Sequence, residues 1–193
     1  IVDDLQPEPS KPSVKVVQIL GGIGNPSAEA HAIRLTSRIA QLVSGEAVYL
    51  PVSGVLATEA ARDILAADEV AQQAIRLFDQ VTTALVGIGS IEPSPLLAQS
   101  GNIFAPQEMK LLRKANAVGD ILLRFFDQNG DLVDTGLEKR VISMSLDQLR
   151  KVSRAIGVAG GSRKYAAILG ALRGHWINIL VTDHFTATRL ANE

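Results

Sequence analysis

The sequence contains no cysteine, only 4% aromatic residues and no excess of either charge, with 19 Lys and Arg against 20 Asp and Glu. Without cysteine, a disulfide framework, a thiolate metal site and a cysteine nucleophile are excluded. The balanced charge argues against a broad polyanion-binding face. No apolar stretch approaches about 18 residues, and no signal-peptide pattern opens the chain. We therefore expect a soluble protein of a reducing compartment, most simply the cytoplasm.

What the sequence does have is hydrophobic residues, which make up 47% of its 193 positions. This content excludes overall disorder, and at about 150 residues per domain the length predicts one domain, with a second only if it is small. Residues 3–13 differ, with three prolines, four charges and no β-branched residue. We expect residues 1–13 to form a linker or disordered tail and residues 14–193 to form the domain. A linker to a preceding segment and an ordinary frayed terminus are equal alternatives here.

Short β-branched segments alternate with longer segments of helical periodicity. The expected strands cover residues 14–20, 46–50, 83–88, 119–126, 155–159 and 177–182. The expected helices cover residues 27–43, 58–78 with a break near Asp68, 106–115, 146–152 and 163–172, before a closing helix. A polar loop is expected over 90–105, and the Asn-Gly pair within 128–131 predicts a hairpin turn. This order predicts an α/β fold with a largely parallel sheet.

The first expected strand ends directly in a glycine-rich turn formed by Gly21, Gly22, Ile23, Gly24 and Asn25. Glycines let backbone N–H groups approach a ligand, and the following helix N-terminus adds positive potential. Phosphate is therefore the expected ligand. The spacing matches neither a Walker loop nor a complete dinucleotide fingerprint. From this turn alone, anion binding and a purely packing role are equally supported.

A second turn contains Gly160 and Gly161 and is followed by Arg163 and Lys164. Two cations in a first helical turn oppose the helix dipole. An anion bound at the turn would remove the conflict, with Lys164 acting as a point charge on it. The alternative is that both side chains reach water or pair with a carboxylate elsewhere.

Asp120 stands at the start of a strongly apolar strand. A carboxylate there is costly unless it is paired or lies at the strand mouth. Sugar hydroxyls or Lys164 could donate to it, and the alternative is a solvent-facing edge residue. Gly89 and Ser53 follow two other strands and could line the same cleft, because parallel sheets bind ligands at their carboxyl ends. The spacing of His31, His175 and His184 predicts no metal site.

Five segments, taken in their order and spacing, resemble the sugar-binding domain of SorC/DeoR-type bacterial transcriptional regulators. The resemblance covers roughly residues 14–191. Its most specific pieces are ALVGIGSIEPSPLL (84–97), AVGDILLRFFDQNG (117–130), VISMSLDQLRKV (141–152), IGVAGGSRKYAAILGALRG (156–174) and INILVTD (177–183). It implies a Rossmann-like, largely parallel sheet flanked by helices, similar to the ribose-phosphate isomerase, glucosamine-phosphate deaminase and CoA-transferase group.

The resemblance also implies a ligand, namely a phosphorylated sugar or a related small polyol. It places the phosphate on the turn from Gly21 to Asn25, and it makes Asp120 and Lys164 ligand contacts. Ser53 stands where some relatives carry an arginine for a second phosphate, which favours a monophosphate or a neutral sugar. We expect both glycine turns to open onto one crevice.

As an effector sensor, the domain would control DNA binding by a separate N-terminal helix-turn-helix that is absent from these residues. The resemblance implies a homodimer or homotetramer, with no cofactor, no catalytic residue and no membrane partner. The alternative is an enzyme on the same fold, a sugar-phosphate isomerase or deaminase, in which Lys164 and Asp120 would act as acid and base.

Overall fold

The structure is a computed structural model that describes residues 2–7, 14–23, 26–91 and 104–193. The chain divides into two compact units, which are described separately. The first unit comprises Ile1–Gln80 with Ser100–Ile103 and Arg140–Ser143. The second comprises Val81–Gln99, Phe104–Lys139 and Met144–Glu193. None of the helices among the described residues is long and apolar enough to cross a membrane.

The first unit contains a two-stranded parallel sheet, β1 (Lys15–Val17) and β2 (Glu46–Val48). The helix α1 (Pro26–Leu42) connects the strands, as parallel neighbours require a crossover. These elements confirm the expected strand–helix–strand order. At the chain start, Asp3 accepts a 2.8 Å hydrogen bond from the guanidinium of Arg34 on α1.

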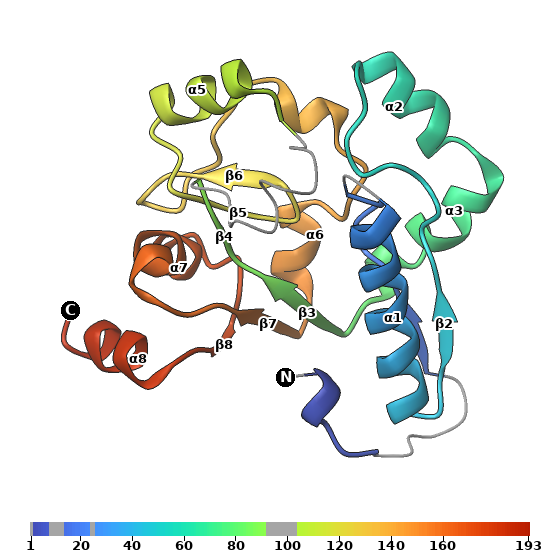
Figure 1. Cartoon of the computed structure of the whole chain (residues 1–193), viewed down its shortest axis with the longest axis horizontal. Helices are drawn as coiled ribbons and strands as arrows, with labels where there is room; N and C mark the ends of the chain where they lie inside the picture. The colour runs from blue at the N-terminus through green and yellow to red at the C-terminus, as the bar shows by residue number, and fades with distance from the viewer. Residues whose placement is uncertain (1, 8–13, 24–25, 92–103) are drawn as a thin grey trace. The chain divides into compact units, whose positions relative to one another are not determined.

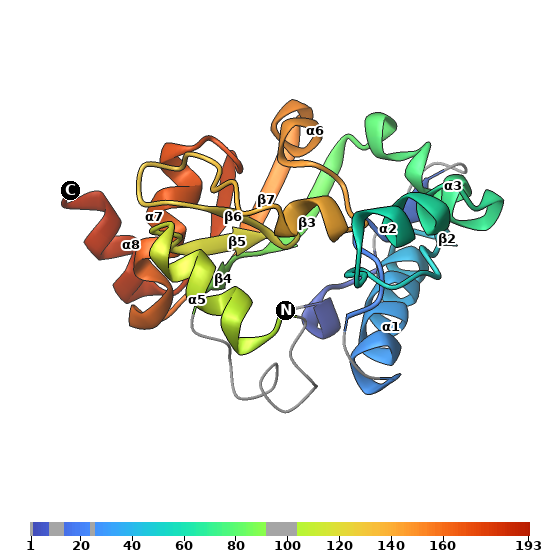
Figure 2. The same cartoon turned by 90° about the horizontal axis from the view of Figure 1, so that it is seen from above.

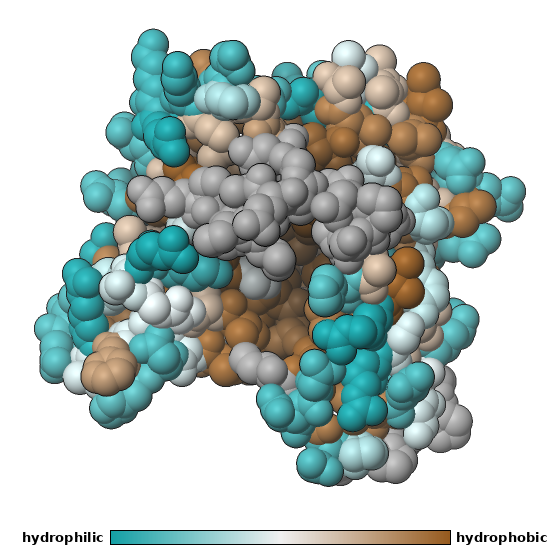
Figure 3. Space-filling model, in the orientation of Figure 1, coloured by the Kyte–Doolittle hydropathy of each residue, from teal (hydrophilic) through white to brown (hydrophobic). Residues whose placement is uncertain are grey.

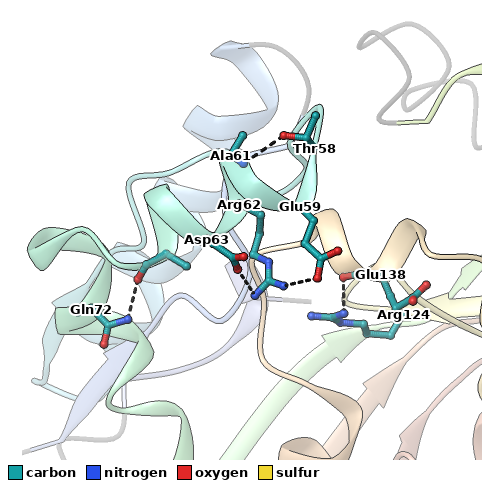
Figure 4. Close-up of polar contacts among 9 residues, drawn as sticks. Thr58, Glu59, Ala61, Arg62, Asp63, Gln72, Arg124 and Glu138 are labelled. Carbon is teal, nitrogen blue, oxygen red and sulfur yellow. Dashed lines mark hydrogen bonds and ion pairs between the residues drawn. The ribbon is translucent and has the colours of Figure 1, made fainter.

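Two short helices, α2 (Glu59–Ala66) and α3 (Glu69–Ile75), complete the first unit. The expected break at Asp68 is confirmed, since this residue caps α3 through a 2.9 Å bond from the amide of Val70. Thr58 caps α2 in the same way (Figure 4). Both caps are hydroxyl or carboxylate side chains that satisfy otherwise unpaired helix N–H groups.

The outer surface of α2 mixes ion pairs with exposed apolar side chains. Arg62 lies 3.1 Å from Asp63 and 3.8 Å from Glu59, as Figure 4 shows. Ile64 is 74% exposed, and Figure 3 shows brown hydrophobic surface over α2 in the upper right.

The second unit is built on a parallel sheet of β3 (Thr83–Gly87), β7 (Arg154–Val158) and β8 (Ile179–Val181), in the order β3-β7-β8. Burial alternates along β3, where Ala84 is buried and Leu85 is exposed. The helices α6 (Leu146–Lys151), α7 (Tyr165–Arg173) and α8 (His184–Ala191) alternate with these strands. The predicted largely parallel α/β architecture is therefore confirmed, although the sheet is not a single one.

A small antiparallel sheet of β4 (Gly89–Ser90), β5 (Gly119–Ile121) and β6 (Arg124–Phe126) accompanies it. The prediction of one strand over 119–126 is wrong. Leu122 and Leu123 adopt left-handed φ values of 54° and 62°, which turns the segment into a hairpin. Nothing local signals this turn, because leucine is among the residues least suited to the left-handed region.

The turn expected over 128–131 is confirmed, with Gly130 at φ 88°. The pairing beyond it is limited to a bridge between Phe126 and Leu132. The buried indole N–H of Trp176 donates to the carbonyl of Gly130 at 2.9 Å, which fixes the turn against the rest of the unit.

The remaining helix of the second unit, α5 (Pro106–Lys114), begins at Pro106 as predicted. Ser145 caps α6, also as predicted, through a 3.1 Å bond from the amide of Gln148. Most of the loop expected over 90–105 lies outside the described residues.

Two glycines with positive φ give a direct test of the turn geometry. A Cβ at Gly130 would meet the backbone nitrogen of Gly174, whereas a Cβ at Gly136 (φ 76°) would meet nothing within 4 Å. We expect Gly136→Ala to cost about 1 kcal/mol from left-handed strain alone. Gly130→Ala should cost about 3 kcal/mol or more, because overpacking adds to the strain. Urea unfolding measures both, and equal costs would contradict the close approach at Gly130.

Candidate functional site

The site in the second unit follows from the direction of its strands. Because β3 and β7 are parallel neighbours, with Gly87 opposite Val158, their carboxyl ends meet at one edge of the sheet. At that edge β3 continues into Ile88, and β7 continues into the turn that carries Lys164. The ammonium Nζ of Lys164 donates a 2.7 Å hydrogen bond to the carbonyl of Ile88.

Asp120 reaches this edge through the small antiparallel sheet, in which Gly89 lies opposite Asp120. A Cβ at Gly89 would meet the carboxylate oxygen Oδ1 of Asp120, so glycine is what makes room for the carboxylate. The other oxygen, Oδ2, accepts a 3.2 Å bond from the amide of Leu123. The structure thus brings together Gly89, Asp120 and Lys164, which the sequence singled out separately.

Two opposing effects determine the pKa of Asp120. Burial raises it to about 6, while the Leu123 amide and the positive charge of Lys164 act in the opposite direction. At neutral pH the carboxylate is therefore mostly ionised, although it is only partly exposed to water. Such a group is a strong acceptor for hydroxyl donors.

The ammonium of Lys164 provides hydrogen-bond donors beside the carboxylate of Asp120. A lysine ammonium carries three N–H donors and no acceptor. Within the described part of the chain, Ile88 uses one of these donors. A carboxylate beside an ammonium can hold a polyol, whose hydroxyl groups both donate and accept.

The turn at Gly160 and Gly161 is exposed. The amide of Gly161 donates a 2.7 Å bond to Oδ2 of Asp183, the residue that caps α8. Anion binding at this turn remains a prediction. Asp183 was missed in the sequence, although an aspartate directly before an expected helix is the usual signal of a cap.

The first glycine turn lies in the first unit, and its two leading amides are engaged in the fold. The amide of Gly21 donates to the carbonyl of Ile142 at 3.0 Å, and that of Gly22 donates to Val52 at 2.7 Å. A Cβ at Gly21 would lie 2.6 Å from the carbonyl oxygen of Val52, so close packing requires the glycine. The packing interpretation therefore accounts for Gly21 and Gly22.

Phosphate binding at the turn from Gly21 to Asn25 remains a prediction. Ile23 is partly exposed, and Gly24 and Asn25 lie outside the described residues. Ser53 is exposed and pairs with Gly22 through a single parallel bridge. That the two glycine turns open onto one crevice also stays a prediction.

Over the ranges that the structure describes, no group of three His, Asp or Glu side chains could hold a metal ion. His31, His175 and His184 are all exposed.

A parallel α/β sheet with a carboxylate, an ammonium and an exposed glycine turn at its carboxyl edge is typical of a domain that binds a small molecule. The family model described as "Putative sugar-binding domain" matches residues 1–192. The chain belongs to this family, the sugar-binding domains of SorC/DeoR-type transcriptional regulators. The predicted resemblance is confirmed.

Three similar proteins support the assignment. The chain is 34% identical over 193 residues to the deoxyribonucleoside regulator of Bacillus subtilis (strain 168), covering 100% of this chain and 61% of the relative. The crystal structure of the full-length sorbitol operon regulator SorC from Klebsiella pneumoniae matches with 32% identity and a TM-score of 0.86, covering 98% of this chain and 61% of that chain.

A sugar-binding domain of a DeoR regulator from Pseudomonas syringae pv. tomato matches with 35% identity and a TM-score of 0.68, covering 98% of this chain and 68% of that chain. The chain spans about three fifths of the length of the B. subtilis and K. pneumoniae regulators. These matches confirm the predicted fold class.

The raised pKa of Asp120 predicts how stability depends on pH. Because this pKa is about 6 in the folded protein, against 3.8 for an aspartate side chain in water, the folded state holds the proton more tightly. The free energy of unfolding should therefore fall as pH rises from about 4 to about 6, by at most about 3 kcal/mol. Asp120→Asn should remove this contribution.

Urea unfolding of both proteins at pH 4, 5, 6 and 7 measures the difference, and Asp147→Asn on the exposed surface of α6 is the control. If the wild-type and Asp120→Asn curves run parallel across this range, the buried environment of Asp120 is not as described.

Proposed function

We propose that this chain is the effector-binding domain of a transcriptional regulator. In this proposal it binds a sugar phosphate or a related small polyol and thereby controls DNA binding by a separate helix-turn-helix domain. The family assignment over residues 1–192 supports a sugar ligand, and the similar curated proteins are named as regulators. A regulator of this kind acts in the cytoplasm, where it can reach DNA.

The observation that carries the proposal is the meeting of Asp120 and Lys164 at the carboxyl edge of the β3-β7-β8 sheet. Sugar hydroxyls suit a partly buried carboxylate, because each hydroxyl can donate to it and accept from the ammonium in turn. The exposed Gly160–Gly161 turn beside Lys164 leaves this edge accessible to a small ligand.

The ligand class is supported by the names of the relatives. They include regulators of deoxyribonucleosides, of a sorbitol operon and of erythritol catabolism. In the proposal, residues 23–25 of the first glycine turn hold a phosphate, if the effector carries one. Ser53 stands where some relatives carry an arginine for a second phosphate, so we expect an effector with one phosphate group or none.

We further propose that binding is not followed by turnover. The relatives are named regulators, and the described site offers one carboxylate and one ammonium. Regulation requires that the effector bind one assembly state better than another. A homodimer or homotetramer would provide those states.

Direct binding tests the proposal. We expect at least one of ribose 5-phosphate, glucose 6-phosphate, sorbitol and erythritol to raise the melting temperature and to give a measurable Kd by titration calorimetry. Asp120→Ala and Lys164→Ala should each weaken that binding by about tenfold or more, since each loses a charge-assisted hydrogen bond.

Lys151→Ala, an exposed lysine at the end of α6, is the matched control and should bind as the wild type does. Unchanged affinity in both site variants would refute the site. Product formation from any of the four compounds, followed by NMR, would refute the absence of turnover.

A further inference from the structure

We infer that Asp183 is a positioning residue of the binding site. It holds the turn from Gly160 to Lys164 so that the ammonium of Lys164 stays at the edge of the sheet beside Asp120. The inference rests on the proposed function for its ligand, but its geometry is independent of any ligand.

Asp183 accepts three hydrogen bonds. Its Oδ1 accepts from the amide of Thr186 at 2.9 Å, and its Oδ2 accepts from the Thr186 hydroxyl and from the amide of Gly161, both at 2.7 Å. These bonds hold the pKa of Asp183 far below its usual range, so the carboxylate is ionised at every working pH.

The hydrogen bond between Gly161 and Asp183 is the first of a series that leads to the proposed ligand site. The carbonyl of Gly161 accepts a 3.0 Å bond from the amide of Lys164, and the side chain of Lys164 donates to Ile88. One series of hydrogen bonds therefore runs from Asp183 through Gly161 and Lys164 to the end of β3. Gly161 at φ 89° makes the sharp bend that this series needs.

Close packing shows that the carboxylate and the turn fit each other. A Cβ at Gly160 would lie 2.5 Å from Oδ2 of Asp183, so the glycine leaves the space that the carboxylate fills. The helix α8 touches the same segment again, where the guanidinium of Arg189 lies 3.5 Å from the ring centre of Tyr165, directly after Lys164. Figures 1 and 2 both show α7 and α8 side by side.

Capping alone does not require the contact with Gly161. An N-cap side chain needs one acceptor for the helix amide, and asparagine serves as well as aspartate. The substitution Asp183→Asn therefore separates the two roles. The amide oxygen of asparagine can replace only one of the two carboxylate oxygens, so it accepts either from Thr186 or from Gly161. The NH₂ group then faces the other N–H group, and two donors cannot form a hydrogen bond.

The first measurement needs no effector. Purified protein is treated with a low dose of acetic anhydride, and acetylation of Lys164 is compared with that of Lys151 by mass spectrometry. We expect Asp183→Asn to raise the relative rate at Lys164 about threefold or more, because the lysine is released from Ile88. Thr58→Ala, which removes the cap of α2, is the matched control, because α2 carries neither lysine, and it should leave the ratio unchanged.

The second measurement uses whichever of the four sugar compounds binds the wild type. Asp183→Asn should weaken its binding about tenfold while lowering the melting temperature no more than Ser145→Ala, which removes the cap of α6. If no compound binds the wild type, the proposed function fails, and the acetylation ratio still decides the role of Asp183.

Acetylation and affinity equal to the wild type in Asp183→Asn would show that Asp183 is only a helix cap and would overturn the inference. If that variant does not fold, amide hydrogen exchange in the wild type decides. The exposed Gly161 amide should then exchange about tenfold or more slowly than an unprotected glycine, and unprotected exchange would overturn the inference.

Discussion

In the second unit, backbone hydrogen bonds pair β3 with β7 and β7 with β8, and all three strands run in the same direction. Their carboxyl ends consequently lie along one edge. Ile88, the turn before Lys164, and Asp183 each follow one of these strands directly. The contacts of Lys164 with Ile88 and of Gly161 with Asp183 depend on that alignment, because the three segments are far apart in the sequence.

Two costly features lie at this edge. Asp120 is a partly buried carboxylate, and Leu122 and Leu123 hold left-handed backbone angles that leucine rarely adopts. One hydrogen bond, from the Leu123 amide to Asp120, serves both features, since it stabilises the ionised carboxylate and closes the turn. Costly groups of this kind persist in proteins where they serve a ligand.

Local signals were enough to predict much of the fold. Hydrophobic periodicity gave α1, the break at Asp68 and the strands of the parallel sheet, and cap residues gave the starts of α5 and α6. The hairpin at Leu122 could not be predicted, because its turn is fixed by Asp120 and by tertiary packing and not by turn-forming residues. Asp120 and Lys164 were found by their unfavourable placement, which a shared site would relieve. Gly89 was found because it follows the end of an expected strand.

The acceptors of the backbone amides in the two glycine turns could not be predicted from the sequence. A glycine turn shows that N–H groups are accessible, but it does not show which acceptor takes them. The amide of Gly21 bonds to Ile142, more than a hundred residues later, and that of Gly161 bonds to Asp183. Both acceptors become neighbours only after folding.

The hydrogen bonds of Asp120 and Lys164 also affect how a ligand can bind. Asp120 accepts from Leu123 and Lys164 donates to Ile88, and both groups keep further hydrogen-bonding capacity. A carboxylate has about four lone-pair sites, and an ammonium has three N–H donors. A ligand can therefore bind both groups while their bonds inside the protein persist. These bonds hold the carboxylate and the ammonium in place before a ligand arrives, which lowers the cost of ordering them on binding.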